Sequence, residues 1–246
     1  MAHRGASSTT PENTLPAFEE AARAGADVVE LDVRLTRDRV PVVLHDPDVS
    51  ATTDGAGQVH TLTVEEVKGL DAGGGGPRVE VPTLEEALRV MDLSGVGVDL
   101  EIKNIPGEEA FDSPDESVLT AVLESLDRVG FAGPVLVSSF NWITIEASRR
   151  LAPDIATGFL TVAAIDPRAA LDYARQQGHA FVLPHAVAVV DAGGAFVREA
   201  HAEGVRVGTW TVDDETTLER MFGWGVDAVA SNDPALAVAV RDRVAQ

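Results

Sequence analysis

Charged residues recur at alternate positions in two apolar segments of the chain. Glu30 and Asp32 lie two residues apart in ADVVELDVRLT, and Glu101 and Lys103 lie two residues apart in VDLEIK. Alternate residues of a strand point to one face, so each segment presents its charges together. If the two faces meet, three carboxylates and an ammonium group converge, and such an oxygen set suits Mg²⁺ or Ca²⁺ better than Zn²⁺. The alternative is a set of buried ion pairs with Arg34 and Lys103, which the spacing alone leaves open.

Two of the six histidines end apolar runs beside another polar group, His3 beside Arg4 and His45 beside Asp46. Imidazole titrates near pH 6.5, so two histidines at one site can act as general base and general acid in turn. His185 ends a further apolar run, but no neighbouring residue assigns it a role. Loop or helix-surface contexts predict solvated, structural roles for three others, His60, His179 and His201.

The elements that must position these residues alternate along the chain. Strands are predicted near residues 1–4, 27–33, 96–102, 134–138, 156–160, 180–184, 205–210 and 226–230. Helices are predicted near residues 15–24, 115–129, 142–151, 167–177, 194–203, 214–223 and 234–243. Eight strands, most of them followed by a helix, predict an α/β fold of the (β/α)₈ TIM-barrel type, with its site at the C-terminal ends of the strands. A doubly wound sheet competes, but no glycine-rich phosphate loop follows a strand.

Residues 46–80 interrupt this alternation and are predicted to form a small insertion after the second strand. The apolar run at 40–46 is expected to pair with the strand before it or to extend the barrel rim. The glycines of DAGGGGPR indicate a flexible connector. No second domain is apparent, so residues 1–246 are interpreted as a single barrel domain.

The composition of the chain excludes several classes of binding partner and site. A formal charge of −21 repels nucleic acid and anionic lipid surfaces, so neither is expected as a partner. Charges interrupt every apolar segment, and stable membrane association is not expected. The chain has no cysteine, which excludes disulfides and thiolate metal sites. No signal peptide is recognised, so a cytoplasmic location is expected, although a trimmed start before His3 stays open.

The motifs HRG, PENT, ELDV, VVLHD, DLEIK, TWTV and GVDAVASNDP follow one another in an order that resembles the glycerophosphodiester phosphodiesterases. The resemblance runs from His3 to about Pro234. It implies a barrel with a small insertion after strand two, matching residues 46–80. It further implies a metal-dependent hydrolase that cuts glycerophosphodiesters into glycerol 3-phosphate and an alcohol.

The resemblance also implies site roles. His3 and His45 match the acid/base pair, and Glu30, Asp32 and Glu101 match the ligands of one divalent cation, Mg²⁺ or Ca²⁺. Phosphate contacts are implied for Arg4 and Lys103, support of the ligand and phosphate residues for Glu12 and Asn13, and an aromatic wall of the glycerol or alcohol pocket for Trp210. One histidine would deprotonate either the neighbouring glycerol hydroxyl, which gives a cyclic phosphate, or water. The other would protonate the departing alcohol.

Two departures from the family pattern concern SND at 231–233, where Thr-Asp is more usual, and the four-glycine run. They put the pocket shape and the insertion in doubt rather than the reaction. A related enzyme acting on lysophospholipids, and a catalytically silent barrel that binds phosphodiesters, are the alternatives. The expected partner is a small glycerophosphodiester. The preferred alcohol, the physiological metal and the oligomeric state are not predicted.

Overall fold

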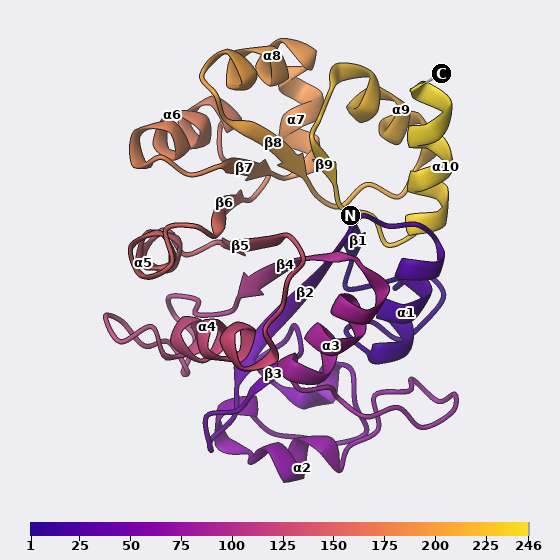
Figure 1. The fold of residues 1–246 in the computed structure, drawn as a ribbon, viewed down its shortest axis with the longest axis vertical. Coiled ribbons are helices and arrows are strands. Elements are labelled where there is room, and N and C mark those ends of the chain that lie inside the picture. The colour runs from indigo at the N-terminus through magenta and orange to yellow at the C-terminus, as the bar shows by residue number, and fades with distance from the viewer. Residues whose placement is uncertain (246) are drawn as a thin grey trace.

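Eight parallel strands form a ring in the order β1-β2-β4-β5-β6-β7-β8-β9 in the computed structural model, which describes residues 1–245 (Figure 1). Their bounds are β1 Ala2–His3, β2 Val28–Leu35, β4 Gly97–Ile102, β5 Val135–Ser139, β6 Ala156–Thr161, β7 Phe181–Pro184, β8 Arg206–Thr209 and β9 Ala228–Val229. A parallel bridge between Ala2 and Ser231 joins the two ends of the sheet, and the His3 N–H donates to the Ser231 carbonyl at 2.9 Å. The predicted (β/α)₈ barrel is confirmed.

Most helices lie within two residues of their predicted ranges. They are α1 Leu15–Arg23, α4 Ser117–Val129, α5 Trp142–Leu151, α6 Pro167–Gln177, α8 Gly194–Ala202, α9 Glu215–Trp224 and α10 Pro234–Val244. Outside residues 46–80, two helices were not predicted, α3 Leu84–Ser94 and α7 Ala186–Ala192. None of the helices in residues 1–245 is both long and apolar enough to cross a membrane.

Capping residues set the helix boundaries. The Thr14 side chain accepts from the Ala17 N–H at the start of α1, and Pro16 occupies the first turn, where its missing N–H costs nothing. Thr83 and Glu86 form a reciprocal capping box at the start of α3. Gly130 ends α4 with a φ of +67°, a conformation that favours glycine.

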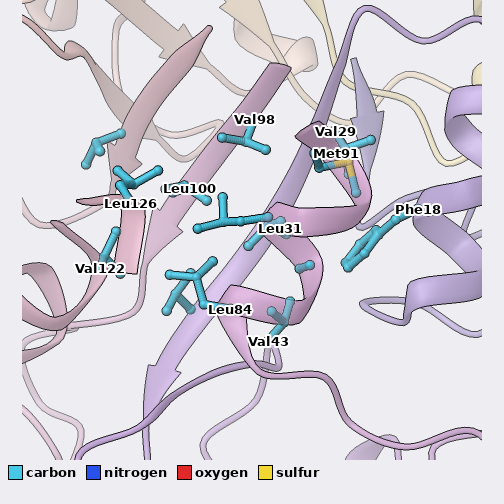
Figure 2. Close-up of a cluster of buried hydrophobic side chains, with 14 of the residues drawn as sticks. Phe18, Val29, Leu31, Val43, Leu84, Met91, Val98, Leu100, Val122 and Leu126 are labelled. Carbon is cyan, nitrogen blue, oxygen red and sulfur yellow. The ribbon is translucent and has the colours of Figure 1, made fainter. Parts of the chain in front are cut away.

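The main apolar core lies between the strands and the helices outside them (Figure 2). Leu31 of β2 and Leu100 of β4 are fully buried there against Phe18 of α1 and Leu84 of α3. Alternate residues of the same strands therefore face the barrel interior, where the charged residues lie. This alternation is what separates the core from the site.

The segment after β2 forms a small lobe. Strand β3, Pro41–Val43, pairs antiparallel with β2, as the run at 40–46 predicted. Two 3₁₀ turns, Val49–Ala51 and Val59–Thr61, and helix α2, Val64–Lys68, follow at the lower end of Figure 1. Val42, Leu44, Val49, Val59, Val67, Ala72 and Val81 give this lobe its own apolar cluster. That the whole chain is a single domain stays an interpretation.

Candidate active site

Strand register brings the acidic residues together. His3 of β1 is opposite Glu30 of β2, while Glu30 and Asp32 are opposite Asp99 and Glu101 of β4. Partners on neighbouring parallel strands point to the same side, here the barrel interior. A cavity of about 340 Å³ opens there. Of the predicted residues, His3, Arg4, Glu30, His45, Glu101, Lys103 and Trp210 line it.

Three carboxylates form the centre of the site. Glu30, Asp32 and Glu101 are buried and offer oxygens that all lie within 4.8 Å of one another. Burial and the neighbouring acids raise the pKa of Glu30 well above its ordinary value. Oε2 of Glu30 accepts from the Arg4 N–H at 2.9 Å, whereas its buried Oε1 has no partner among the described residues. This oxygen-only set, with one oxygen free, fits a divalent cation.

Two cationic side chains contact the same acids. Lys103 Nζ lies 2.9 Å from Asp32 Oδ1 and also contacts Glu101, and Arg4 Nε lies 3.2 Å from Asp32 Oδ2. Burial opposes ionisation of Asp32, but Lys103 and Arg4 outweigh it and hold its pKa well below the usual range. Burial raises the pKa of Glu101 to about 7 despite Lys103. Ion pairing and a cation-binding arrangement of acids therefore coexist at this site.

The PENT segment supports these contacts. Arg4 Nη1 donates to Glu12 Oε1 at 2.9 Å, and Asn13 Nδ2 donates to Asp32 Oδ2 at 2.8 Å. Arg4 has a φ of +55°, which is uncommon for a residue other than glycine. The Asn13 N–H donates to the Arg4 carbonyl at 3.0 Å and so holds that turn. Glu12 and Asn13 thus orient Arg4 and Asp32 from behind the cavity.

His3 lies between Glu30 of the acidic cluster and Asn232 near the C-terminus. Its Nδ1 lies 2.7 Å from Asn232 Oδ1, and its Nε2 lies 4.0 Å from Glu30 Oε2. Burial, with the adjacent Arg4 charge, lowers the pKa of His3. The ring is therefore neutral near pH 7.

His45 follows β3, the strand that pairs antiparallel with β2. Its Nδ1 lies 3.0 Å from Asp46 Oδ1, and its carbonyl accepts from Arg34 Nε at 2.7 Å. Arg34 also donates to both carboxylate oxygens of Glu108, at 2.6 and 3.1 Å, so it does not pair with the three acids. Burial and the Lys103 charge lower the pKa of His45. Both histidines can therefore accept a proton near neutrality.

The opposite wall of the cavity is apolar. Phe140, Leu160, Leu183 and Trp210 follow or end strands β5 to β8 and line it. Trp210 Nε1 donates to the Leu183 carbonyl at 3.0 Å, and its ring meets Phe140 edge to face at 5.3 Å. His185 packs edge to face on Trp210 at 4.9 Å and caps α7, where its Nδ1 accepts from the Val187 N–H. His185 therefore supports the wall rather than lining the cavity.

The remaining histidines lie away from the cavity. His201 Nε2 lies 2.8 Å from Asp227 Oδ2, and His60 Nε2 lies 3.9 Å from Glu109. The prediction that His179 is solvated was wrong, because it is 3% exposed and its Nδ1 lies 2.8 Å from Thr157 Oγ1. Gly178 ends α6 with a φ of +73°, and the His179 N–H donates to the Ala174 carbonyl of that helix at 2.8 Å.

Several cavity residues were not among the predicted site residues. Asp99 and Ser138 line the cavity, and burial raises the pKa of Asp99 to about 7. Asp99 precedes Glu101 by two residues, so the alternation contained a signal for it. Asn232 is 229 residues from His3, and no local spacing could have joined the two.

Comparison with known proteins agrees with this geometry. Residues 3–236 match the model of the glycerophosphoryl diester phosphodiesterase family. A glycerophosphodiester phosphodiesterase of Caldanaerobacter subterraneus is 35% identical over 245 residues, covering 95% of this chain and 93% of that protein. One from Bacillus altitudinis is 32% identical over 254 residues, covering 99% and 98%.

Solved structures share the fold. An Oleispira antarctica phosphodiesterase, in complex with its product sn-glycerol-3-phosphate, has a TM-score of 0.87 at 32% identity and covers 98% of this chain and 95% of its own. A glycerophosphodiester phosphodiesterase of Parabacteroides distasonis has a TM-score of 0.83 at 25% identity, covering 100% and 97%. The family match spans nearly the whole chain and confirms the resemblance of the motifs. The chain belongs to the glycerophosphoryl diester phosphodiesterase family and is a phosphoric diester hydrolase.

Proposed function

We propose that the chain hydrolyses glycerophosphodiesters to glycerol 3-phosphate and an alcohol, with a divalent cation held by Glu30, Asp32 and Glu101. The observation that carries this proposal is that three buried carboxylates offer oxygens within 4.8 Å of one another, and that two of them, Glu30 and Glu101, line one cavity together with both histidines. Mg²⁺ and Ca²⁺ both suit carboxylate oxygens. Glu30 Oε1 has no hydrogen-bond partner within residues 1–245, which supports a cation rather than ion pairs alone.

Arg4 and Lys103 would bind the phosphate. The chain as a whole carries a charge of −21, so attraction of an anionic diester must come from a local source. Both side chains line the cavity and are held by buried acids. When bound, the cation would neutralise non-bridging phosphate oxygens as charge develops on them.

His3 and His45 would move the protons. One would take the proton of the nucleophile, either the glycerol hydroxyl next to the phosphate, which gives a cyclic phosphate, or water. The other would protonate the alcohol oxygen as its bond to phosphorus breaks. Burial lowers the pKa of both rings, so the ring that acts as the base is neutral near pH 7, and the other ring must take up a proton from solvent before it can protonate the alcohol. Trp210 and its apolar neighbours would hold the carbon atoms of the glycerol or the alcohol.

The test measures glycerol 3-phosphate release from glycerophosphocholine and glycerophosphoethanolamine, after EDTA and then with Mg²⁺ or Ca²⁺ restored. Release should vanish with EDTA and return with one cation. His3→Ala and His45→Ala should lose turnover while His60→Ala, on the surface lobe, keeps it. Near-normal rates in either cavity variant would end the histidine assignment. No release by folded protein under either cation would favour a silent, phosphodiester-binding barrel.

A specific observation favours a second substrate class. Five of the eight large apolar side chains exposed in the described residues follow strands β5, β6 and β7 along the chain: Trp142, Ile143, Val162, Ile165 and Val187. The same strands supply Phe140, Leu160 and Leu183 to the apolar wall of the cavity, so these exposed side chains would suit the acyl chain of a lysophospholipid. Choline release from lysophosphatidylcholine should then exceed that from glycerophosphocholine, and Trp142→Ser should remove the difference. Leu93→Ser, at a side chain 89% exposed on α3, is the matched control.

A further inference from the structure

A chain of hydrogen bonds leads from His3 out of the cavity. His3 Nδ1 lies 2.7 Å from Asn232 Oδ1, and Asn232 Nδ2 donates to Asp213 Oδ2 at 2.6 Å. The Asn232 N–H donates to the other carboxylate oxygen of Asp213 at 2.7 Å. Ser7 Oγ lies 2.9 Å from Asn232 Oδ1 and can donate to it as well. The lining residues of the cavity do not include Asn232, Asp213 or Ser7.

The chemistry of Asp213 determines which way the amide of Asn232 points. A carboxylate only accepts hydrogen bonds, so the NH₂ group of Asn232 must face Asp213. Its carbonyl oxygen must then face His3, and an amide oxygen only accepts. His3 therefore donates from Nδ1, and in the neutral ring Nε2 carries a free lone pair. Nε2 is the nitrogen on the side of Glu30, 4.0 Å from its Oε2.

We infer that Asn232 and Asp213 are positioning residues that hold His3 in the Nδ1–H tautomer, with Nε2 ready to accept a proton in the cavity. This inference rests on the proposed function and names His3 as the base of the first step. Hydrogen-bond partners of this kind, one shell behind a reacting imidazole, commonly fix its tautomer and ring orientation. Asn232 is the middle residue of SND, the segment that departs from the family pattern, so the departure includes the residue that orients His3.

A merely structural role would be satisfied by the backbone contacts alone. The Ser8 N–H donates to the Asn232 carbonyl and the His3 N–H to the Ser231 carbonyl, both at 2.9 Å. These bonds close the barrel whichever way the Asn232 amide points. The side-chain amide and the Asp213 carboxylate can therefore be tested separately from the fold.

The first variant is Asp213→Asn, at an exposed residue outside the cavity. The NH₂ group of the new Asn then faces the NH₂ group of the Asn232 side chain, and two donors cannot bond to each other. The Asn232 amide therefore turns and presents its NH₂ to His3. His3 then accepts at Nδ1 and carries its hydrogen on Nε2. We expect kcat for glycerophosphocholine to fall about 10- to 100-fold, with KM within about twofold. Asp214→Asn, at the adjacent N-cap of α9, is the matched control and should change neither.

The second variant exchanges the two groups, Asp213→Asn with Asn232→Asp. Asn at 213 can accept from the backbone N–H of residue 232 and donate to the new carboxylate, which again accepts from His3 Nδ1. This pair should recover most of the lost kcat. Recovery of kcat would show that an acceptor facing His3 Nδ1 is what the first variant lost. If the two residues acted only on the structure, the second substitution would lower kcat further.

The tautomer is measured without turnover, by ¹⁵N chemical shifts of the histidine ring in protein labelled at histidine and assigned with His3→Asn. In the native protein Nδ1 of neutral His3 should be the protonated nitrogen, and in Asp213→Asn Nε2 should be. The inference is overturned if native His3 carries its hydrogen on Nε2, or if Asp213→Asn changes neither tautomer nor kcat. Absence of turnover in the native protein with the expected tautomer would instead refute the proposed function.

Discussion

Lys103 offers a direct measurement of what the buried charge cluster contributes to stability. It is 6% exposed and makes ion pairs with Asp32, at 2.9 Å, and with Glu101. Lys68 makes the same number of pairs, with Glu80 at 3.2 Å and Glu86 at 2.7 Å, but its side chain is 29% exposed. The change is Lys103→Met, which keeps the length of the side chain, with Lys68→Met as the matched control.

The expected costs differ because of burial. Removing one partner of a buried pair leaves an uncompensated charge and typically costs about 3–5 kcal/mol, whereas exposed pairs contribute about 0–1 kcal/mol. Arg4 and Asn13 still contact Asp32 in the variant, so its carboxylate keeps part of its stabilisation. We expect about 3 kcal/mol for Lys103→Met and under about 1 kcal/mol for Lys68→Met at pH 8.

The cost should also depend on pH. Burial raises the pKa of Glu101 to about 7, so at pH 5 this carboxyl is already protonated in the native state. Lys103 lowers the pKa of Glu101, so this pKa rises further in the variant, and above pH 7 the folded variant holds more of this proton than the native protein does, whereas the unfolded chain releases it near pH 4.3. A state that binds more protons loses stability as the pH rises. The difference between the variant and the native protein should therefore grow from pH 5 to pH 8.

Urea unfolding, followed by far-UV circular dichroism in EDTA at pH 5 and pH 8, provides the free energies of unfolding. EDTA keeps divalent cations from replacing the lost positive charge. The reasoning is refuted if Lys103→Met costs no more than Lys68→Met at pH 8. A difference that shrinks as the pH rises would refute the assigned role of Glu101.

Three further predictions concern the rest of the molecule. Burial, with Arg149 nearby, lowers the pKa of His179, so the contribution of this ring to stability should be lost as the pH falls below about 6.5, and in urea unfolding the native protein and His179→Asn should differ less at pH 5 than at pH 8. Leu100→Ala, at a fully buried residue, should cost about 2–5 kcal/mol by the same assay. A Cβ at Gly208 would lie 2.5 Å from Leu183, so Gly208→Ala should push that side chain into the cavity and raise KM for glycerophosphocholine.

Much of the site could be predicted because its chemistry interrupts regular patterns. Glu30 and Asp32, like Glu101 and Lys103, break apolar strands at period two, and strand pairing alone brings them together. The contacts that hold the histidines could not be predicted in this way. Arg34 reaches Glu108, 74 residues along the chain, because loops after neighbouring strands meet at one rim of the barrel. Sequence spacing contains no information about which loops meet.

The two missed helices have different causes. Helix α3 begins with TLEE, a capping-box sequence, but the glycine run just before it is the stronger local signal and favours a connector. Helix α7 consists of AVAVVDA, whose valines favour strands over helices. Its cap is His185, which is not a preferred N-cap residue. Packing of Ala186 and Val189 in the core stabilises this helix, which the local sequence alone does not favour.

The apolar half of the cavity explains why the preferred alcohol could not be predicted. A charged residue in an apolar strand stands out, but an apolar residue looks the same whether it fills the core or contacts a substrate. Val182 of β7 packs among the helices, while Leu183, the next residue, lines the cavity. Gly158 and Gly208 leave room for Leu183, since a Cβ on either would lie 2.6 or 2.5 Å from it. The shape of the alcohol pocket thus depends on residues whose role only the closed barrel determines.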